Sequence, residues 1–242
     1  MNGIMLYLIG LGLNEKGFSR EALDAVSLSD IVYLESYTIE FPYSLEILKK
    51  EFGGKRIIPA DRNFVENAEE IISEAKKKNV ALLVYGSPLT ATTHISLIEQ
   101  ARKAKTKVKI IYAASVFDAI AETGLQIYKF GKIASMPKFP AESYLEIVKN
   151  NQKIKAHSLI LIDIGYEFAD ALKRLNQNCK NKKISLDKIV VCSRLGTNES
   201  KIFYDFVKNL EIKKVRTPFC IIIPGEMHFL EQDVLESFDI PH

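Results

Sequence analysis

The chain has 242 residues, enough for one large domain or two small ones. Hydrophobic residues make up 47% and charged residues 26%, a balance typical of globular proteins and unlike that of disordered chains. A net charge of +3 is too small to indicate nucleic acid as a partner, and no apolar run approaches the roughly 18 residues that a membrane-spanning helix needs. Two of the three cysteines, Cys192 and Cys220, lie in apolar strand-like runs, and Cys179 is far from both in sequence. This pattern predicts buried free thiols and a reducing, cytoplasmic location.

The first half of the sequence alternates apolar runs with helical patterns. We expect strands over residues 4–11, 31–34, 56–59, 80–85 and 108–112. Helices are expected over residues 19–27, 44–52, 64–78 and 95–105, with Ser19 as a cap and an i,i+4 pair of Glu46 and Lys50. This alternation predicts a parallel sheet with helices on both faces.

The second half begins after a polar and aromatic stretch, and we place a domain boundary between residues 112 and 132. Strands are expected over 132–136, 157–162, 188–192 and 219–223, helices over 116–122, 143–150 and around 168–175, and an edge strand over 201–210. A closing helix is expected from the spacing of Met227, Leu230, Val234 and Phe238. We therefore predict an α/β fold of two lobes, residues 1–114 with a parallel sheet and residues 115–242 with a mixed sheet, and a ligand cleft between them.

The residues that follow the expected strands are candidates for ligand binding, because open α/β sheets bind ligands at the carboxyl ends of their strands. The run 80–85 ends at the turn Gly86-Ser87-Pro88, which is followed by a threonine-rich stretch. An ordinary strand-to-helix turn is the alternative interpretation. The strand ends supply glycines, hydroxyls and apolar side chains, at Gly12, Leu13, Ser87, Thr90, Ser115, Val116, Ile162, Ser193 and Leu195. Such a set suits a flat, mostly apolar ligand such as an adenosine, and does not suit hydrolysis, phosphoryl transfer or metal chemistry.

A dinucleotide-binding dehydrogenase is a weaker interpretation. Gly10-Leu11-Gly12 follows the first expected strand, and Glu35 at the end of the second is placed where a ribose contact would be. The third glycine of the fingerprint is replaced by Glu15, whose carboxylate would repel a pyrophosphate.

Histidines and carboxylates offer few catalytic candidates, and no spacing of zinc ligands is present. His94 either contacts a ligand or caps the helix that follows it, whereas His157 is interpreted as structural. Asp163 and Glu167 would form an acid and base pair, but we favour the interpretation that they satisfy backbone amides at a helix start.

Five segments together resemble the diphthine synthases, the methyltransferases of diphthamide biosynthesis, which are related to the tetrapyrrole methylases. The segments are MLYLIGLGL at Met5–Leu13, GSPLTATTH at Gly86–His94, GLQIYKFGK at Gly124–Lys132, LIDI at Leu161–Ile164 and PGEMHFLE at Pro224–Glu231. The tetrapyrrole methylases proper usually show G-x-G-P-G-D after the first strand. Leu13-Asn14-Glu15 stands there instead, which favours the diphthine synthases.

The resemblance implies methyl transfer from S-adenosylmethionine, with S-adenosylhomocysteine as product, to the amino group of a modified histidine on translation elongation factor 2. It also implies two α/β lobes with the cofactor between them, a homodimer and a cytoplasmic protein. The family's cofactor contacts correspond to Leu13, Ser87, Thr90, Ser115, Val116, Ile162, Leu195 and Phe219. No residue is predicted as the general base, although Asp163 and His94 are candidates.

Two of these residues depart from the family pattern. Ser87 replaces the usual aspartate, so the position offers a hydrogen bond and no charge, and Phe219 replaces a frequent histidine. The chain is also shorter than most relatives around residues 137–144 and 163–188, in loops that would help dock the protein substrate. Two alternatives therefore remain, namely a tetrapyrrole or small-molecule methylase and a catalytically impaired module that binds the elongation factor.

Overall fold

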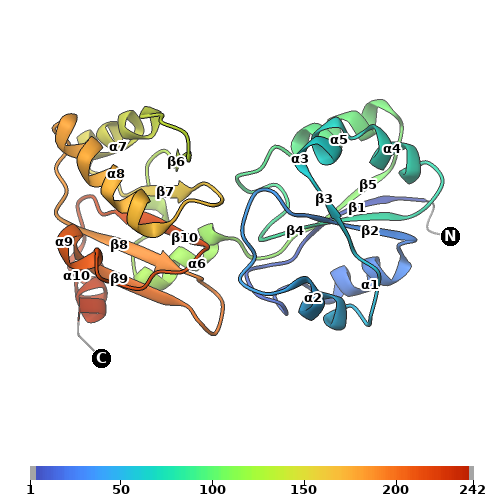
Figure 1. Ribbon diagram of the computed structural model, residues 1–242, viewed down its shortest axis with the longest axis horizontal. Helices are drawn as coiled ribbons and strands as arrows, with labels where there is room; N and C mark the ends of the chain where they lie inside the picture. The colour runs from blue at the N-terminus through green and yellow to red at the C-terminus, as the bar shows by residue number, and fades with distance from the viewer. Residues whose placement is uncertain (1–3, 240–242) are drawn as a thin grey trace. The chain divides into compact units, whose positions relative to one another are not determined.

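The computed structural model describes residues 4–239, which belong to two compact units (Figure 1). The first unit is Met1–Val116 and the second is Phe117–His242. The division lies within the interval of residues 112–132 in which the sequence places a boundary. That residues 1–114 and 115–242 are separate domains stays a prediction.

Five parallel strands form the sheet of the first unit, in the order β3-β2-β4-β1-β5. The strands are β1 (Leu6–Gly10), β2 (Ile31–Glu35), β3 (Ile58–Ala60), β4 (Val80–Val84) and β5 (Val108–Ile111). One face is covered by α1 (Arg20–Leu28) and α2 (Leu45–Glu51), and the other by α3 (Arg62–Asn67), α4 (Glu69–Ala75) and α5 (Ile95–Lys103) (Figure 1). The predicted parallel sheet with helices on both faces is confirmed.

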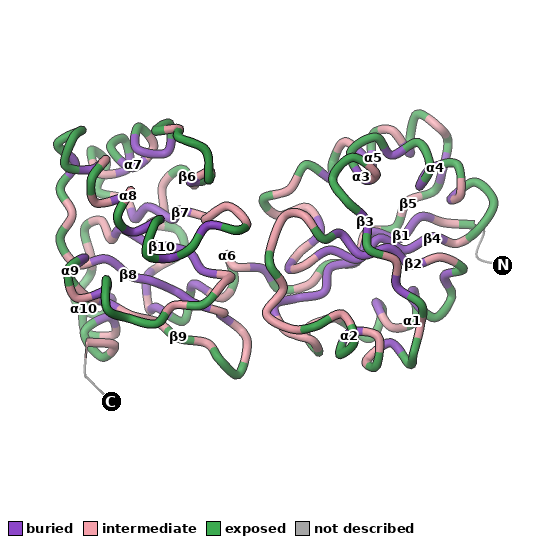
Figure 2. The backbone as a smooth tube through the Cα atoms, viewed as in Figure 1, coloured by how far each residue is buried: buried purple, intermediate pink, exposed green. Residues whose placement is uncertain are grey.

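The inner strand β1 is buried on both faces, as Figure 2 shows for the inner strands of this sheet. Leu6 and Leu8 face the core built with α3, α4 and α5, whereas Tyr7 and Ile9 face the core built with α1 and α2. Successive side chains of a strand point to opposite faces, so a strand between two helical layers needs apolar residues at every position. This requirement explains the unbroken apolar run at the start of the sequence.

The single helix expected over residues 64–78 is wrong, because two helices occupy this segment. Ala68 has a left-handed backbone, with φ of 58°, and separates α3 from α4. Val65 in α3 and Ile71 in α4 are both buried. In one straight helix, residues six positions apart point about 120° away from each other. The break at Ala68 brings both side chains onto the sheet.

The predicted Ser19 cap is confirmed, and Ser44 caps α2 in the same way, but one predicted ion pair is wrong. The side chains of Ser19 and Ser44 accept hydrogen bonds from the first turns of α1 and α2. Glu46 pairs with Lys49 at 2.7 Å and not with Lys50, so the predicted i,i+4 pair is wrong. Residues three apart lie on the same helix face as well as residues four apart, and the sequence alone does not choose between them.

The second unit contains a mixed sheet in the order β6-β7-β10-β8-β9, which confirms that prediction. Its strands are β6 (Ala134–Met136), β7 (Ser158–Ile162), β8 (Lys188–Ser193), β9 (Lys201–Phe206) and β10 (Phe219–Ile223). Only β6 and β7 pair in parallel. The main core lies under α7 (Ser143–Lys153), α8 (Phe168–Asn181) and α9 (Val207–Leu210). The other helical segments are α6 (Val116–Ala119), α10 (Phe229–Glu236), η1 (Ile120–Thr123), η2 (Ile127–Lys129) and η3 (Ser237–Asp239).

The sequence predicts an edge strand and a closing helix in the second unit, and β9 and α10 occupy these places. The predicted edge strand over residues 201–210 is confirmed as far as Phe206, after which the short helix α9 begins. The predicted closing helix is confirmed as α10, although Leu230, one of the residues whose spacing predicts it, is 57% exposed. The buried residues of α10 are Leu235 and, unexpectedly, Glu231.

Glu231 is buried because its carboxylate receives four hydrogen bonds. The donors are the backbone N–H of Gln126 at 2.8 Å and of His228 at 2.7 Å, the ammonium of Lys129, and Nε2 of His157 at 3.1 Å. Burial raises the pKa of Glu231, but the hydrogen bonds from Gln126, Lys129, His228 and His157 outweigh burial and lower the pKa to about 2. The other ring nitrogen of His157 accepts from the N–H of Gly225 at 2.8 Å, so His157 has the structural role that the sequence predicts.

The three cysteines are buried and free, as predicted. Cys192 on β8 lies opposite Cys220 on β10, at the centre of the second sheet. Cys179 lies in α8, where burial raises the pKa of its thiol to about 12. The thiol of Cys179 therefore stays protonated near neutral pH, and all three cysteines serve as core side chains.

Candidate functional site

Two glycines join the carboxyl ends of β1 and β4. The N–H of Gly12 donates to the carbonyl oxygen of Gly86 at 3.1 Å, and the N–H of Gly86 donates to that of Gly12 at 2.9 Å. Both glycines have left-handed backbones, with φ of 69° and 68°, which a residue with a Cβ adopts only with strain. Because this bridge fixes both strand ends, the residues that follow it, Leu13 and Ser87, leave adjacent strands at adjacent positions.

The segment after Gly86 folds back on itself. The N–H of Thr90 donates to the carbonyl oxygen of Ser87 at 3.1 Å, which closes a turn. His94 occupies the cap position of α5, but its side chain makes no capping hydrogen bond, so the predicted cap is wrong. The imidazole is instead buried, with Nδ1 3.0 Å from the carbonyl oxygen of Pro88. Ser87 and Thr90 therefore lie on a turn that is held by hydrogen bonds within the segment from Ser87 to His94.

Ser115 lies beside this turn. It follows β5, which is the neighbour of β1 on the side away from β4. A Cβ built on Gly86 would lie 3.8 Å from Cα of Ser115, so the two backbones are close. Val116, the next residue, begins α6. Structure thus brings Leu13, Ser87 and Ser115 to one edge of the first sheet.

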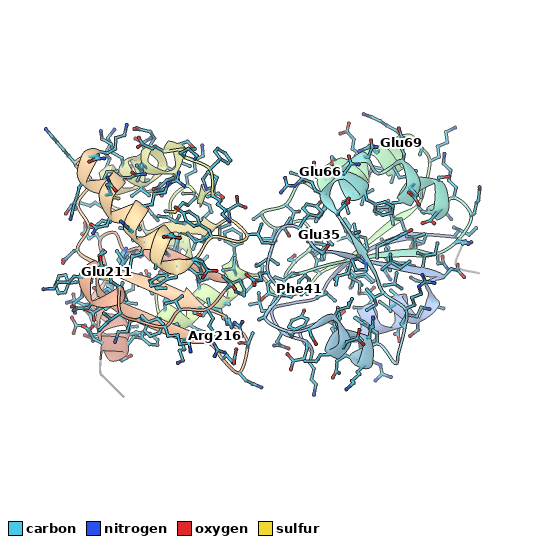
Figure 3. The ribbon with its side chains drawn as sticks, viewed as in Figure 1. Glu35, Phe41, Glu66, Glu69, Glu211 and Arg216 are labelled. Carbon is cyan, nitrogen blue, oxygen red and sulfur yellow. The ribbon has the colours of Figure 1, made fainter. Side chains whose placement is uncertain are left out.

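An aromatic group that the sequence did not single out packs against this edge. The hydroxyl of Tyr85 donates to the carbonyl oxygen of Leu13 at 2.9 Å. Phe41, labelled in Figure 3, contacts Tyr85 edge-on at 5.3 Å between ring centroids, and Tyr43 packs edge-on against Phe41 at 5.5 Å. The hydroxyl of Tyr43 is buried without a hydrogen-bond partner, and burial raises its pKa, which keeps it protonated. The only sequence sign of this group is the F-P-Y run at residues 41–43.

Glu35 does not present a free carboxylate at the edge of the sheet. It is fully buried at the end of β2 and accepts from the N–H groups of Tyr37 and Thr38, at 3.2 and 2.8 Å, and from the hydroxyl of Thr38 at 2.8 Å. Figure 3 labels Glu35 in this segment. A carboxylate occupied in this way is not free for the hydroxyls of a ribose, which argues against the dinucleotide-binding interpretation.

The predicted contact residues of the second unit also share one end of their sheet. Leu161 on β7 lies opposite Cys220 on β10, and Phe219 lies opposite Ser193 at the end of β8. Ile162 and Leu195 therefore lie at the same end as Phe219. The ring of Phe219 packs edge-on against Phe168 of α8, with centroids 5.5 Å apart. Phe219 is 8% exposed, so its ring serves mainly the core of this unit.

Asp163 and Glu167 follow β7 but do not form a catalytic pair. The carboxylate of Asp163 accepts from the N–H of Lys138 at 3.2 Å and from that of Ile164 at 3.0 Å. The carboxylate of Asp163 satisfies backbone amides, but the favoured interpretation places them at a helix start, and Lys138 and Ile164 do not lie at one. The interpretation is also wrong for Glu167, whose exposed side chain does not cap α8.

Residues 4–239 lack two other kinds of feature. These residues contain no group of three or more histidine, cysteine, aspartate or glutamate side chains placed to hold a metal ion. None of the helices in the same range has both the length and the apolar character needed to cross a bilayer.

Comparisons with known proteins find relatives over nearly the whole length of the chain. The model of the tetrapyrrole (corrin/porphyrin) methylase family matches residues 5–211. The chain is 35% identical to the diphthine synthase of Methanococcus maripaludis, over 96% of this chain and 98% of that protein. It is 34% identical to the probable diphthine methyl ester synthase of Arabidopsis thaliana, over 97% and 98%. A crystal structure of a diphthine synthase superposes with a TM-score of 0.90 at 32% identity, covering 98% of this chain and 97% of that one.

Proposed function

This chain belongs to the tetrapyrrole methylase family as a relative of the diphthine synthases, and we propose that it methylates the amino group of the modified histidine of translation elongation factor 2. As a family member it is a methyltransferase that depends on S-adenosylmethionine. The observation that carries the proposal is the edge of the first sheet, where a bridge of two glycines places uncharged residues side by side. The product of the proposed reaction is diphthine.

The chemistry of this edge fits the cofactor. S-adenosylmethionine supplies a methyl group that its sulfonium has already activated, so the protein needs no metal and no covalent intermediate. We propose that Leu13, Ser87, Thr90, Ser115 and Val116 of the first unit contact it through backbone groups, hydroxyls and apolar surface. Ile162, Leu195 and Phe219 are the proposed contacts of the second unit. The backbone of Gly17 approaches Gly12 so closely that a Cβ on Gly12 would lie 2.5 Å from its carbonyl oxygen, so this position requires glycine.

The acceptor amine must be neutral to attack, and two candidate bases are already occupied. His94 has Nδ1 against the carbonyl oxygen of Pro88 and Nε2 3.4 Å from the hydroxyl of Tyr37. The carboxylate of Asp163 accepts from two backbone amides. We therefore propose that the amine proton leaves to water. Orienting the amine and the methyl group in line would supply ~7–11 kcal/mol of barrier lowering.

The test is transfer of a labelled methyl group to elongation factor 2 that carries the unmethylated diphthamide precursor. We expect label on the factor that resists mild alkaline hydrolysis, because an N-methyl bond is stable to base. Label that alkali removes would indicate a methyl ester, the product named for the plant relative. Label on an added precorrin would indicate a small-molecule methylase. No label and no thermal stabilisation by S-adenosylmethionine would indicate an impaired module that only binds the factor.

We further propose that the protein is a cytoplasmic homodimer, as the family resemblance implies. In the second unit, Glu231 of α10 binds Gln126 and Lys129, which lie at the start and end of η2. Four large apolar side chains of η2 and α10 are exposed, with exposed fractions of 45% for Ile127, 82% for Tyr128, 69% for Phe229 and 57% for Leu230. A group of exposed large apolar side chains supports a protein interface. Light scattering after size exclusion should give twice the chain mass of 27.3 kDa. Tyr128→Ser should shift the mass toward that of the monomer, and a monomeric unvaried protein would contradict the proposal.

A further inference from the structure

The carbonyl oxygen of Pro88 accepts two hydrogen bonds from side chains that follow it in the chain. The hydroxyl of Thr92 lies 3.1 Å away, and Nδ1 of His94 lies 3.0 Å away. A carbonyl oxygen only accepts, so Nδ1 carries a proton. His94 is 2% exposed, and its bond to Pro88 is therefore shielded from water. Both side chains thus fix the turn from the side of α5.

The other ring nitrogen of His94 faces the segment after β2. Nε2 lies 3.4 Å from the hydroxyl of Tyr37, which is a long contact. Tyr37 is held in turn, because its N–H donates to the buried carboxylate of Glu35 and its ring lies 5.1 Å from the guanidinium carbon of Arg62. The position of the imidazole is therefore set by the neighbouring strand as well as by its own helix.

The turn needs such support because its backbone is strained. Ala91 has a φ of 55°, in the left-handed region that residues with a Cβ rarely adopt. A backbone of this kind persists when surrounding contacts determine it. Thr92 and His94 both lie within three residues after Ala91, and the side chain of each forms a hydrogen bond with the carbonyl oxygen of Pro88.

We infer that Thr92 and His94 are positioning residues for the cofactor: by holding the carbonyl of Pro88 they keep Ser87 and Thr90 in the geometry that binds S-adenosylmethionine. This inference depends on the proposed function, since it concerns the same turn. Neither side chain is assigned a contact with the cofactor. Their effect is on affinity, through the shape of the turn.

The first test compares the same substitution at adjacent positions. Thr92→Val removes a donor to Pro88 and keeps the branched shape, whereas Thr93→Val alters an exposed side chain next to it. Titration calorimetry with S-adenosylhomocysteine should show about tenfold weaker binding for Thr92→Val, as expected for a partly buried hydrogen bond. Thr93→Val should bind within about twofold of the unvaried protein.

The second test uses two amides in place of the imidazole. In His94→Asn the amide nitrogen takes the place of Nδ1 and is able to donate to Pro88, whereas in His94→Gln it takes the place of Nε2. Both variants lose the ring, so thermal unfolding should show a similar loss of stability in both. Affinity for S-adenosylhomocysteine should be largely retained in the asparagine variant and fall at least about tenfold in the glutamine variant.

The outcomes separate this inference from the function on which it depends. If the unvaried protein does not bind S-adenosylhomocysteine, the proposed function fails and the positioning role fails with it. If the unvaried protein binds, but Thr92→Val equals Thr93→Val and the two His94 variants bind alike, only the positioning role is overturned. Weakening that is confined to Thr92→Val and His94→Gln supports it.

Discussion

Gly10, the last residue of β1, is the position where one added methyl group should disturb the proposed cofactor site most directly. A Cβ at this position would lie 2.7 Å from the carbonyl oxygen of Gly86, 2.9 Å from Cδ of Pro88 and 3.1 Å from Cβ of Ala113. The first two contacts are closer than folded proteins tolerate. The oxygen of Gly86 cannot retreat freely, because it accepts from the N–H of Gly12. Gly10→Ala must therefore displace the turn that carries Ser87.

The expected cost follows from these overlaps. Forcing extra carbon atoms into a packed site typically costs ~1–3 kcal/mol, and we expect about 2 kcal/mol for Gly10→Ala. In a chain of this length that corresponds to a melting temperature lower by roughly 4–8 °C. Affinity for S-adenosylhomocysteine should fall at least about tenfold, since about 1.4 kcal/mol of lost binding free energy has that effect.

A control separates the loss of stability from the loss of the site. Gly54 follows α2, has a φ of 81°, and a Cβ there would meet no atom within 4 Å. Gly54→Ala should lower stability by about 1 kcal/mol through backbone strain and leave cofactor affinity unchanged. Differential scanning fluorimetry and titration calorimetry on both variants provide the two measurements. Unchanged affinity in Gly10→Ala would refute the reasoning that the β1 and β4 ends shape the binding turn.

Three further predictions concern single side chains. Tyr85→Phe removes the hydrogen bond to the carbonyl oxygen of Leu13 and should weaken S-adenosylhomocysteine binding severalfold in calorimetry. Tyr43→Phe removes a buried hydroxyl that has no partner and should raise the free energy of unfolding by about 1 kcal/mol in denaturant titrations, whereas a lower value would indicate a partner. The pKa of the Glu231 carboxyl is lowered from its ordinary value of 4.5 to about 2 in the folded protein. The hydrogen bonds to the carboxylate therefore stabilise the fold above pH 4.5 by up to about 3 kcal/mol, and this stabilisation is lost as the pH falls toward 2. Glu231→Gln should lower stability at pH 7 and remove this acid-dependent loss from urea titrations across pH 5 to 2, and an unchanged pH profile would show that Glu231 is not its source.

The parts of the fold that local sequence determines were predicted well. The strands of the first unit are recognisable as apolar runs because inner strands such as β1 and β4 are buried on both faces of the sheet. Ser19 and Ser44 mark helix starts because their hydroxyls accept from the first turn. The predicted contact residues Leu13 and Ser87 lie at neighbouring strand ends because a parallel sheet brings its carboxyl ends to one edge.

The features that the sequence did not reveal depend on residues far apart in the chain. Glu231 occupies an inner position of α10 only because Gln126 and His157, 105 and 74 residues away, donate to it. The break at Ala68 serves the packing of two helices on one sheet, which helical periodicity does not report. The contact of Phe41 with Tyr85 joins the segment after β2 to the end of β4, which are neighbours only once the sheet has formed.

A crystal structure of the protein with bound S-adenosylhomocysteine is the most direct test of the proposed cofactor site. The account predicts electron density for the adenosyl group in contact with Leu13, Ser87 and Ser115 of the first unit. Density for the ligand at any other place, with these strand ends free of it, would contradict the account.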